Sequence, residues 1–195
     1  MSTFSAVVTT GIYCRPGCGA RPKPENVRKF TLAAAAEVAG YRACLRCRPY
    51  RTEPSIGWTA PELVCRAVRL ILDGALDGKT EHDLGGRLGI SARHLRRLFG
   101  DHLGVTPDQL ARSSRAHFAR RLLDDTDFPI VDIAFAAGFG SVRRFNDAFR
   151  VTYARPPSLF LLPRNVLSRF TAGVPHMGFS AAPLCSLSFP LSAFS

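Results

Sequence analysis

The sequence has little lysine, no long apolar run and no secretory leader. Lys23, Lys29 and Lys79 are the only lysines among 26 basic residues, so arginine supplies nearly all of the positive charge. No stretch reaches the roughly 18 consecutive apolar residues of a membrane span. Residues 1–8 lack the basic region and apolar core of a signal peptide. These absences exclude membrane insertion and predict a cytoplasmic protein with reduced thiols.

The charge that is present is strongly positive. The 195 residues, enough for one or two small domains, include 26 Lys+Arg against 15 Asp+Glu, which gives a net charge of +11 and a pI near 10.1. Arginine favours bidentate contacts with phosphate and guanine. The balance favours a nucleic-acid partner. Charge alone leaves open a solvated surface whose arginines reflect high-GC codon usage.

Four cysteines near the N-terminus form two short-spaced pairs. Cys14 and Cys18 have C-x3-C spacing, 25 residues follow, and Cys44 and Cys47 have C-x2-C spacing. In a reducing compartment, two such pairs are typical of one tetrahedral metal site. We therefore predict Zn²⁺ as the cofactor, bound by these four thiolates. By this pattern alone, a closed structural site without chemistry is the commoner alternative.

The chain divides by composition into four parts. Residues 1–50 hold the cysteines, with a strand predicted at 4–8 and a helix at about 31–39. Residues 51–58 are a predicted linker, 59–160 read as all helix, and 161–195 have no sustained apolar period. We expect a small α+β zinc-binding domain, an all-α domain, and an unpatterned tail that is disordered or frameshifted.

The helical part repeats itself at a period of about 50 residues. Helices are predicted from 59, with a stripe of Leu63, Ala67, Leu70 and Ile71, then at about 81–88, 92–103, 107–125, 130–137 and 142–153. In the long fourth helix, Leu110, Phe118 and Leu122 are expected to face inward. Each repeat is helix, glycine-containing turn, helix, which indicates two helix-turn-helix units. A generic helical bundle explains the paired turns less well.

The second helix of each unit offers polar side chains to DNA. With Leu95 and Phe99 in one core and Phe145 and Phe149 in the other, the predicted contacts are Arg93, His94, Arg96, Arg97, Arg143, Arg144 and Asn146. Cys65 is expected in the core. The other histidines, His82, His102, His117 and His176, are expected at the surface.

These motifs carry a family resemblance. Residues 9–16, Thr-Thr-Gly-Ile-Tyr-Cys-Arg-Pro, with Cys18, Cys44 and Cys47, resemble the metal-binding domain of the Ada family of alkylation-response proteins. Residues 80–157 are similar to an AraC-type DNA-binding domain. The resemblance implies a single-turnover DNA methylphosphotriester:cysteine S-methyltransferase that also activates transcription of repair genes. Its implied methyl acceptor is Cys14, and its implied backbone contacts are Thr10, Arg21 and Arg42.

The same resemblance implies binding partners for the protein, and the departures from the family leave alternative functions open. Double-stranded DNA and RNA polymerase are the expected partners of a monomer. The chain departs from the family in having Gly19 at a basic contact, no helix before the first strand, and no Pro-Cys-His-Arg methyltransferase motif. The alternatives are a zinc-containing AraC-type transcription factor without transfer chemistry and a non-functional fragment of a regulator–glycosylase fusion. A redox sensor that uses the four thiols is the least favoured of the alternative functions.

Overall fold

The computed structural model describes residues 3–51 and 60–161. Apart from Arg51 and Leu161, the predicted linker at 51–58 and the tail at 161–195 lie outside the described residues, as does His176. Within the described ranges, no helix combines the length and the apolar character needed to cross a membrane.

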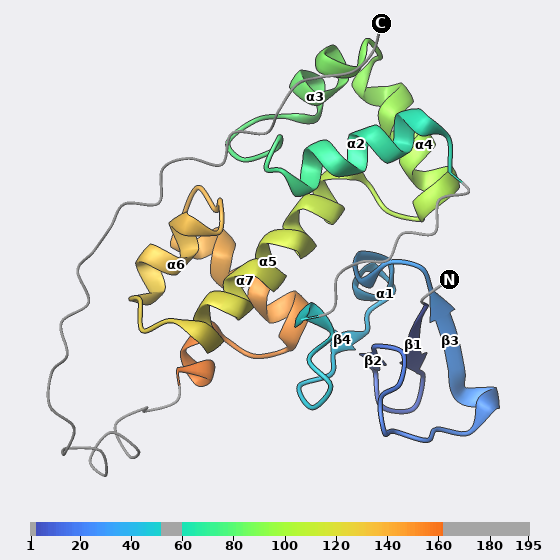
Figure 1. Cartoon of the computed structure of the whole chain (residues 1–195), viewed down its shortest axis with the longest axis vertical. Helices are drawn as coiled ribbons and strands as arrows, with labels where there is room; N and C mark the ends of the chain where they lie inside the picture. The colour runs from blue at the N-terminus through green and yellow to red at the C-terminus, as the bar shows by residue number, and fades with distance from the viewer. Residues whose placement is uncertain (1–2, 52–59, 162–195) are drawn as a thin grey trace, which may run out of the picture. The chain divides into compact units, whose positions relative to one another are not determined.

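The N-terminal part is a four-stranded sheet with one short helix. The strand order is β3-β1-β2-β4, where β1 is Phe4–Val7, β2 is Ile12–Cys14, β3 is Val27–Phe30 and β4 is Arg42–Ala43 (Figure 1). β1 pairs antiparallel with β2 and β3, whereas β2 pairs parallel with β4. Helix α1, Ala33–Val38, and two 3-10 helices, Pro24–Asn26 and Pro49–Arg51, complete this part.

Strand alternation gives the sheet a core face and an open face. Phe4 and Ala6 of β1, Tyr13 of β2 and Ala43 of β4 are buried on the core face. Because successive side chains of a strand point to opposite sides, Ser5, Cys14 and Lys29, which are register partners, share the other face. The strand prediction at 4–8 is confirmed, and the helix predicted at 31–39 is shorter than expected.

The C-terminal part is all helix, as expected. Its helices are α2 Glu62–Leu72, α3 Glu81–Leu88, α4 Ala92–Leu103, α5 Pro107–Asp125, α6 Ile130–Ala136 and α7 Val142–Tyr153, followed by a 3-10 helix at Pro157–Phe160. Helices α3 and α4 form one helix-turn-helix unit, α6 and α7 form the other, and α5 runs between them (Figure 1). The α+β-then-all-α fold class is therefore confirmed.

Local capping explains where the helices begin. Thr80 and Thr106 form capping boxes with Asp83 and Gln109 at the starts of α3 and α5. Ser91 and Ser141 accept hydrogen bonds from backbone N–H groups in the first turns of α4 and α7. Equivalent serines at equivalent places show that the two units repeat in structure as well as in sequence.

The repeat is also visible in the cores. Leu84, Leu95 and Phe99 are fully buried in the first unit. Their counterparts in the second unit, Ile133, Phe145 and Phe149, are fully buried as well. Cys65 is buried in α2, as predicted, and its thiol donates to the Ala60 carbonyl at 3.5 Å.

The predictions of inward-facing residues are right only in part. In α2, Ala67 and Ile71 are buried and Leu70 packs against the core, as predicted, whereas Leu63 is only partly buried. The prediction also missed Val64 and Val68, which are fully buried. In α5, Phe118 is 40% exposed, and the Arg121 guanidinium lies over its ring. Phe118 is exposed because α5 packs against its neighbours through other faces, where the buried residues include the small Ala116 and Ala119.

A pair of adjacent glycines in α3 tests the packing of the first unit. A Cβ on Gly85 would lie 2.6 Å from the Ile90 carbonyl oxygen, whereas a Cβ on Gly86 would meet nothing within 4 Å. Gly85→Ala should lower the free energy of unfolding by about 1–3 kcal/mol through overpacking. Gly86→Ala should raise it by about 0.5–1 kcal/mol through helix propensity. Urea unfolding of both variants checks the contrast, and equal effects would contradict it.

Candidate metal centre and nucleic-acid interface

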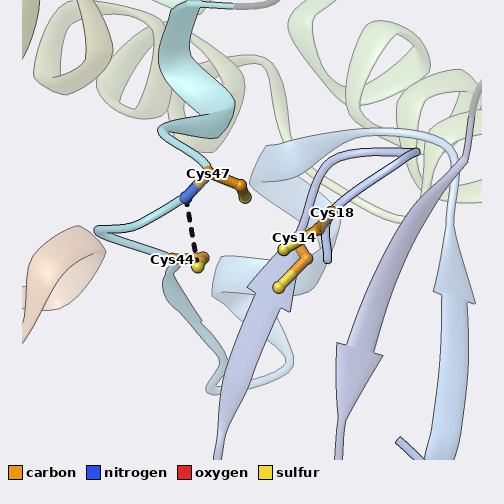
Figure 2. A group of neighbouring side chains, drawn as sticks. All are labelled: Cys14, Cys18, Cys44 and Cys47. Atoms are coloured by element: carbon orange, nitrogen blue, oxygen red, sulfur yellow. Dashed lines mark hydrogen bonds between the residues drawn. The ribbon is translucent and has the colours of Figure 1, made fainter. Parts of the chain in front are cut away.

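Parallel pairing of β2 with β4 brings the two cysteine pairs together. Ile12 and Tyr13 are paired with Arg42 and Ala43, so the next residue on each strand is a cysteine, Cys14 or Cys44. The Cys44 N–H donates to the Tyr13 carbonyl at 3.0 Å. Each strand then turns, and the turn presents the second cysteine of the pair. Figure 2 shows the four side chains converging from these two segments.

The four sulfurs are spaced for one metal ion. The Sγ atoms of Cys14, Cys18, Cys44 and Cys47 all lie within 4.8 Å of one another. Four sulfurs on a tetrahedral zinc, each at about 2.3 Å, are separated by about 3.8 Å. The Cys47 N–H also points at the Cys44 Sγ, at 3.5 Å. The donor set and its spacing therefore fit Zn²⁺.

Burial is the largest influence on the pKa of three of the four thiols, those of Cys14, Cys44 and Cys47. Burial raises the pKa of Cys14 well above its ordinary value, and the neighbouring Cys44 raises it further. Burial likewise raises the pKa of Cys47 to about 11. Burial also opposes ionisation of Cys44, but hydrogen bonds from the backbone N–H groups of Cys47 and Arg46 outweigh it and lower that pKa. A bound divalent cation would favour the thiolate form of its sulfur ligands.

A groove with a volume of about 780 Å³ runs along the open face of the sheet beside Cys14 and Cys18. Among the described residues, its charged lining residues are Arg15, Arg21 and Lys29, with no carboxylate. The groove is therefore a cationic channel past Cys14. Of the three backbone contacts implied by resemblance, Arg21 lines this groove.

The other two implied contacts lie near the beginning of β2. Arg42 pairs with Ile12, so alternation puts both on the face that carries Cys14. Thr10 is exposed in the turn between β1 and β2, and its hydroxyl donates to the Val7 carbonyl at 3.5 Å. Neither residue lines the groove.

In the helical part, five of the seven predicted DNA contacts are exposed: Arg93, Arg96, Arg97, Arg143 and Arg144. His94 and Asn146 are half-buried. Two arginines have protein partners: Arg96 forms an ion pair with Glu81 of α3, and Arg97 contacts the His94 ring at 3.2 Å. Of the predicted contacts, Arg93 on α4 and Arg143 and Arg144 on α7 are the other solvent-facing arginines.

A buried polar network next to the metal centre was missed by sequence reasoning. The Tyr13 hydroxyl donates to Glu37 Oε1 at 2.7 Å, and the same oxygen lies 2.8 Å from His117 Nε2. The other ring nitrogen of His117 lies 2.9 Å from the Tyr153 hydroxyl. The network joins β2, α1, α5 and the last residue of α7. Burial, followed by the negative charge of Glu37, raises the pKa of both tyrosines well above the ordinary value.

The surface assignment of His117 was therefore wrong, since its side chain is only 13% exposed. His82 and His102 are exposed, as predicted. Glu37 carried one usable signal in the sequence, because it is the single charged residue of the helix Ala-Ala-Ala-Ala-Glu-Val. A lone carboxylate in an otherwise apolar helix is rarely buried without partners.

A sheet with a four-cysteine centre, joined to two helix-turn-helix units, defines a zinc-binding, AraC-type DNA-binding regulator. Residues 2–50 match the metal-binding domain of Ada, and residues 84–162 match a helix-turn-helix domain. The C-terminal domain of AraT, a response regulator from Geobacillus stearothermophilus, superposes with a TM-score of 0.51 at 25% identity. That match covers 53% of this chain and 87% of the AraT domain.

Relatives with the same two domains narrow the class to a family. The Bacillus subtilis bifunctional transcriptional activator/DNA repair enzyme AdaA is 31% identical over 80% of this chain and 73% of its own length. The Mycobacterium tuberculosis probable bifunctional transcriptional activator/DNA repair enzyme AlkA is 42% identical over 89% of this chain but only 35% of its own length. The chain belongs to the Ada family of bifunctional regulators and repair enzymes.

The buried network predicts a large stability cost at Glu37. In Glu37→Leu the Tyr13 hydroxyl and the His117 ring lose their shared acceptor and keep only their contact with each other, at 3.2 Å, and that of His117 with Tyr153. Loss of a buried acceptor of this kind should cost about 1–3 kcal/mol. Glu25→Leu, at an exposed position of the first 3-10 helix, should stay within about 0.5 kcal/mol of wild type. Urea unfolding of the zinc-loaded proteins measures both. Equal stability of the two variants would show that the network does not form.

Proposed function

We propose that this protein repairs methylphosphotriesters in DNA by irreversible methyl transfer to Cys14, and that the methylated protein activates transcription. The observation that carries the proposal is a four-sulfur cluster beside a cationic groove, which both Cys14 and Cys18 line. The resemblance of residues 9–16 to the Ada family assigns the acceptor role to Cys14. A sulfur with both properties can be a ligand and a nucleophile. In this proposal Cys14, Cys18, Cys44 and Cys47 bind the zinc.

Zinc, when bound, supplies the positive charge that keeps the four sulfurs ionised at neutral pH. The Cys14 thiolate then attacks the methyl carbon of the triester. A bond forms between Sγ and carbon, the carbon–oxygen bond breaks, and its electron pair stays on the phosphate oxygen as a diester anion. The step needs no proton transfer and no oxidant.

The chain's own residues would hold the DNA strand for this attack. Arg21 in the groove, with Thr10 and Arg42 near the start of β2, are the proposed backbone contacts. Alignment of the sulfur lone pair with the methyl carbon supplies much of the rate in such reactions. Methylation removes one negative charge from the centre. At a few ångströms and an effective dielectric near 20, one charge is worth on the order of a few kcal/mol before salt screening, which strengthens DNA binding.

The helical part would then read a promoter. Arg93 of α4 and Arg143 and Arg144 of α7 lie on helices expected to enter successive major grooves. The 19 residues of α5, which lies between the two units, span about 28 Å, somewhat less than the about 34 Å of one DNA turn. We infer that one monomer in the cytoplasm contacts both grooves and then RNA polymerase.

Mass spectrometry tests the chemistry. After incubation with a duplex that carries one methylphosphotriester, a single methyl group should be found on Cys14. Cys14→Ser should abolish transfer. Cys65→Ser, which changes a cysteine outside the cluster, should leave transfer in place. Zinc content is measured on the same samples. Wild type and Cys65→Ser should each bind one zinc ion per chain, which would show that their metal centre is intact.

Two outcomes would contradict the proposal. A methyl group on Cys18, Cys44 or Cys47 would assign the reaction to another sulfur. No transfer from a zinc-loaded protein would leave the transcription factor without transfer chemistry as the function.

DNA binding provides a second prediction. Arg143→Ala, at an exposed position in the first turn of α7, should lower affinity for the cognate promoter by about 1–3 kcal/mol if the side chain reads a base. Arg66→Ala removes the same charge from the exposed side of α2 and should have a much smaller effect. Fluorescence anisotropy at two salt concentrations measures both. An equal loss in the two variants would mean that α7 does not read bases.

A further inference from the structure

The open face of the sheet carries a cation that no family motif accounts for. Lys29 of β3 is the register partner of Ser5 in β1, and Ser5 is the register partner of Cys14 in β2. These three side chains therefore form one row across three adjacent strands. Lys29 donates to the Ser5 hydroxyl at 3.0 Å, is exposed, and lines the same groove as Cys14.

We propose that Lys29 is a positioning residue that binds a phosphate adjacent to the one being repaired. This inference rests on the proposed function. Neighbouring strands are about 4.8 Å apart, so two strand spacings put Lys29 roughly 10 Å from Cys14. A DNA strand offers one phosphate per about 3.4 Å of helix axis, so an ionised phosphate beside the triester falls within this span.

Charge explains why the cation is set at a distance from Cys14. A methylphosphotriester is neutral, so a cation placed over it gains little Coulomb energy. The phosphates on either side keep their charge, and a lysine ammonium binds them as a compact point charge. A cation two strands away therefore holds the damaged strand by its intact neighbours. Ser5 orients the ammonium without neutralising it.

The groove around Lys29 has the matching electrostatics. Its other charged lining residues, Arg15 and Arg21, are cationic, and within residues 3–51 and 60–161 no carboxylate lines it to compete for the ammonium. The adjacent Arg28 is exposed but does not line the groove, and alternation directs it to the opposite face of β3. Arg28 is therefore a matched control, one residue away and equal in charge.

The test is single-turnover methyl transfer from a duplex carrying one methylphosphotriester, with full-length protein and zinc content measured in parallel. For Lys29→Gln, which keeps a donor for Ser5 but loses the charge, the protein concentration at half-maximal rate should rise. The maximal rate should stay closer to wild type. Lys29→Arg should restore binding, and Arg28→Gln should resemble wild type. A structural role alone would change stability but would not separate these two kinetic quantities.

Salt dependence of binding to the same duplex gives a readout that does not need transfer. Loss of one phosphate contact lowers the slope of log K against log salt by about 0.9. The affinity ratio of wild type to Lys29→Gln should therefore shrink about 3.5-fold between 50 and 200 mM salt. If wild type transfers no methyl group, the proposed function fails while this slope still decides the role of Lys29. Equal slopes for Lys29→Gln and Arg28→Gln would overturn the inference.

Discussion

The rest of the N-terminal part depends on the convergence of four sulfurs within 4.8 Å. The strands that carry them are short: β2 has three residues and β4 has two, so their hydrogen bonds alone contribute little stability. Domains of this size usually need a metal or another cross-link, because their apolar core is small. The free energy of zinc binding at such a site also contributes to the stability of the folded state. In the proposed function, the methyl-accepting cysteine is therefore also a ligand of the site that holds the sheet together, so methyl transfer would alter that site.

A second constraint is the buried hydrogen-bond network that begins next to the cysteine cluster. Tyr13, the residue before Cys14, shares its Glu37 acceptor with His117 of α5, and His117 in turn contacts Tyr153 at the end of α7. Tyr13 and Tyr153 also belong to one apolar cluster with Phe145 and Phe149. Any coupling between the metal centre and DNA reading requires a physical connection of this kind. The network gives a change at Cys14 a route of direct contacts to the helix that carries Arg143 and Arg144.

The sequence predicts local features of this fold well and long-range polar contacts poorly. The starts of α3, α4, α5 and α7 agree with prediction, because each begins at a side-chain cap that bonds a backbone N–H three residues on. The caps are Thr80, Ser91, Thr106 and Ser141. The cysteine cluster was also predictable, since spacing and residue type specify it. The contact between Glu37 and His117 spans 80 residues, and no local pattern encodes it. Phe118 was misplaced for the opposite reason: periodicity marks an apolar residue but does not say which neighbour covers it.

The two parts of the chain present positive charge in different forms, and the forms suit different tasks. On the sheet, the cations line a groove beside Cys14 and Cys18. Contacts of this type position the backbone without reading sequence, which suits damage that can arise anywhere. On α4 and α7, the arginines lie on helices that fit the major groove, where base edges can be distinguished. Because α4 and α7 are separated by α5, the proposed promoter contacts would be spaced by a helix, whereas the proposed repair contacts need only one phosphate strand.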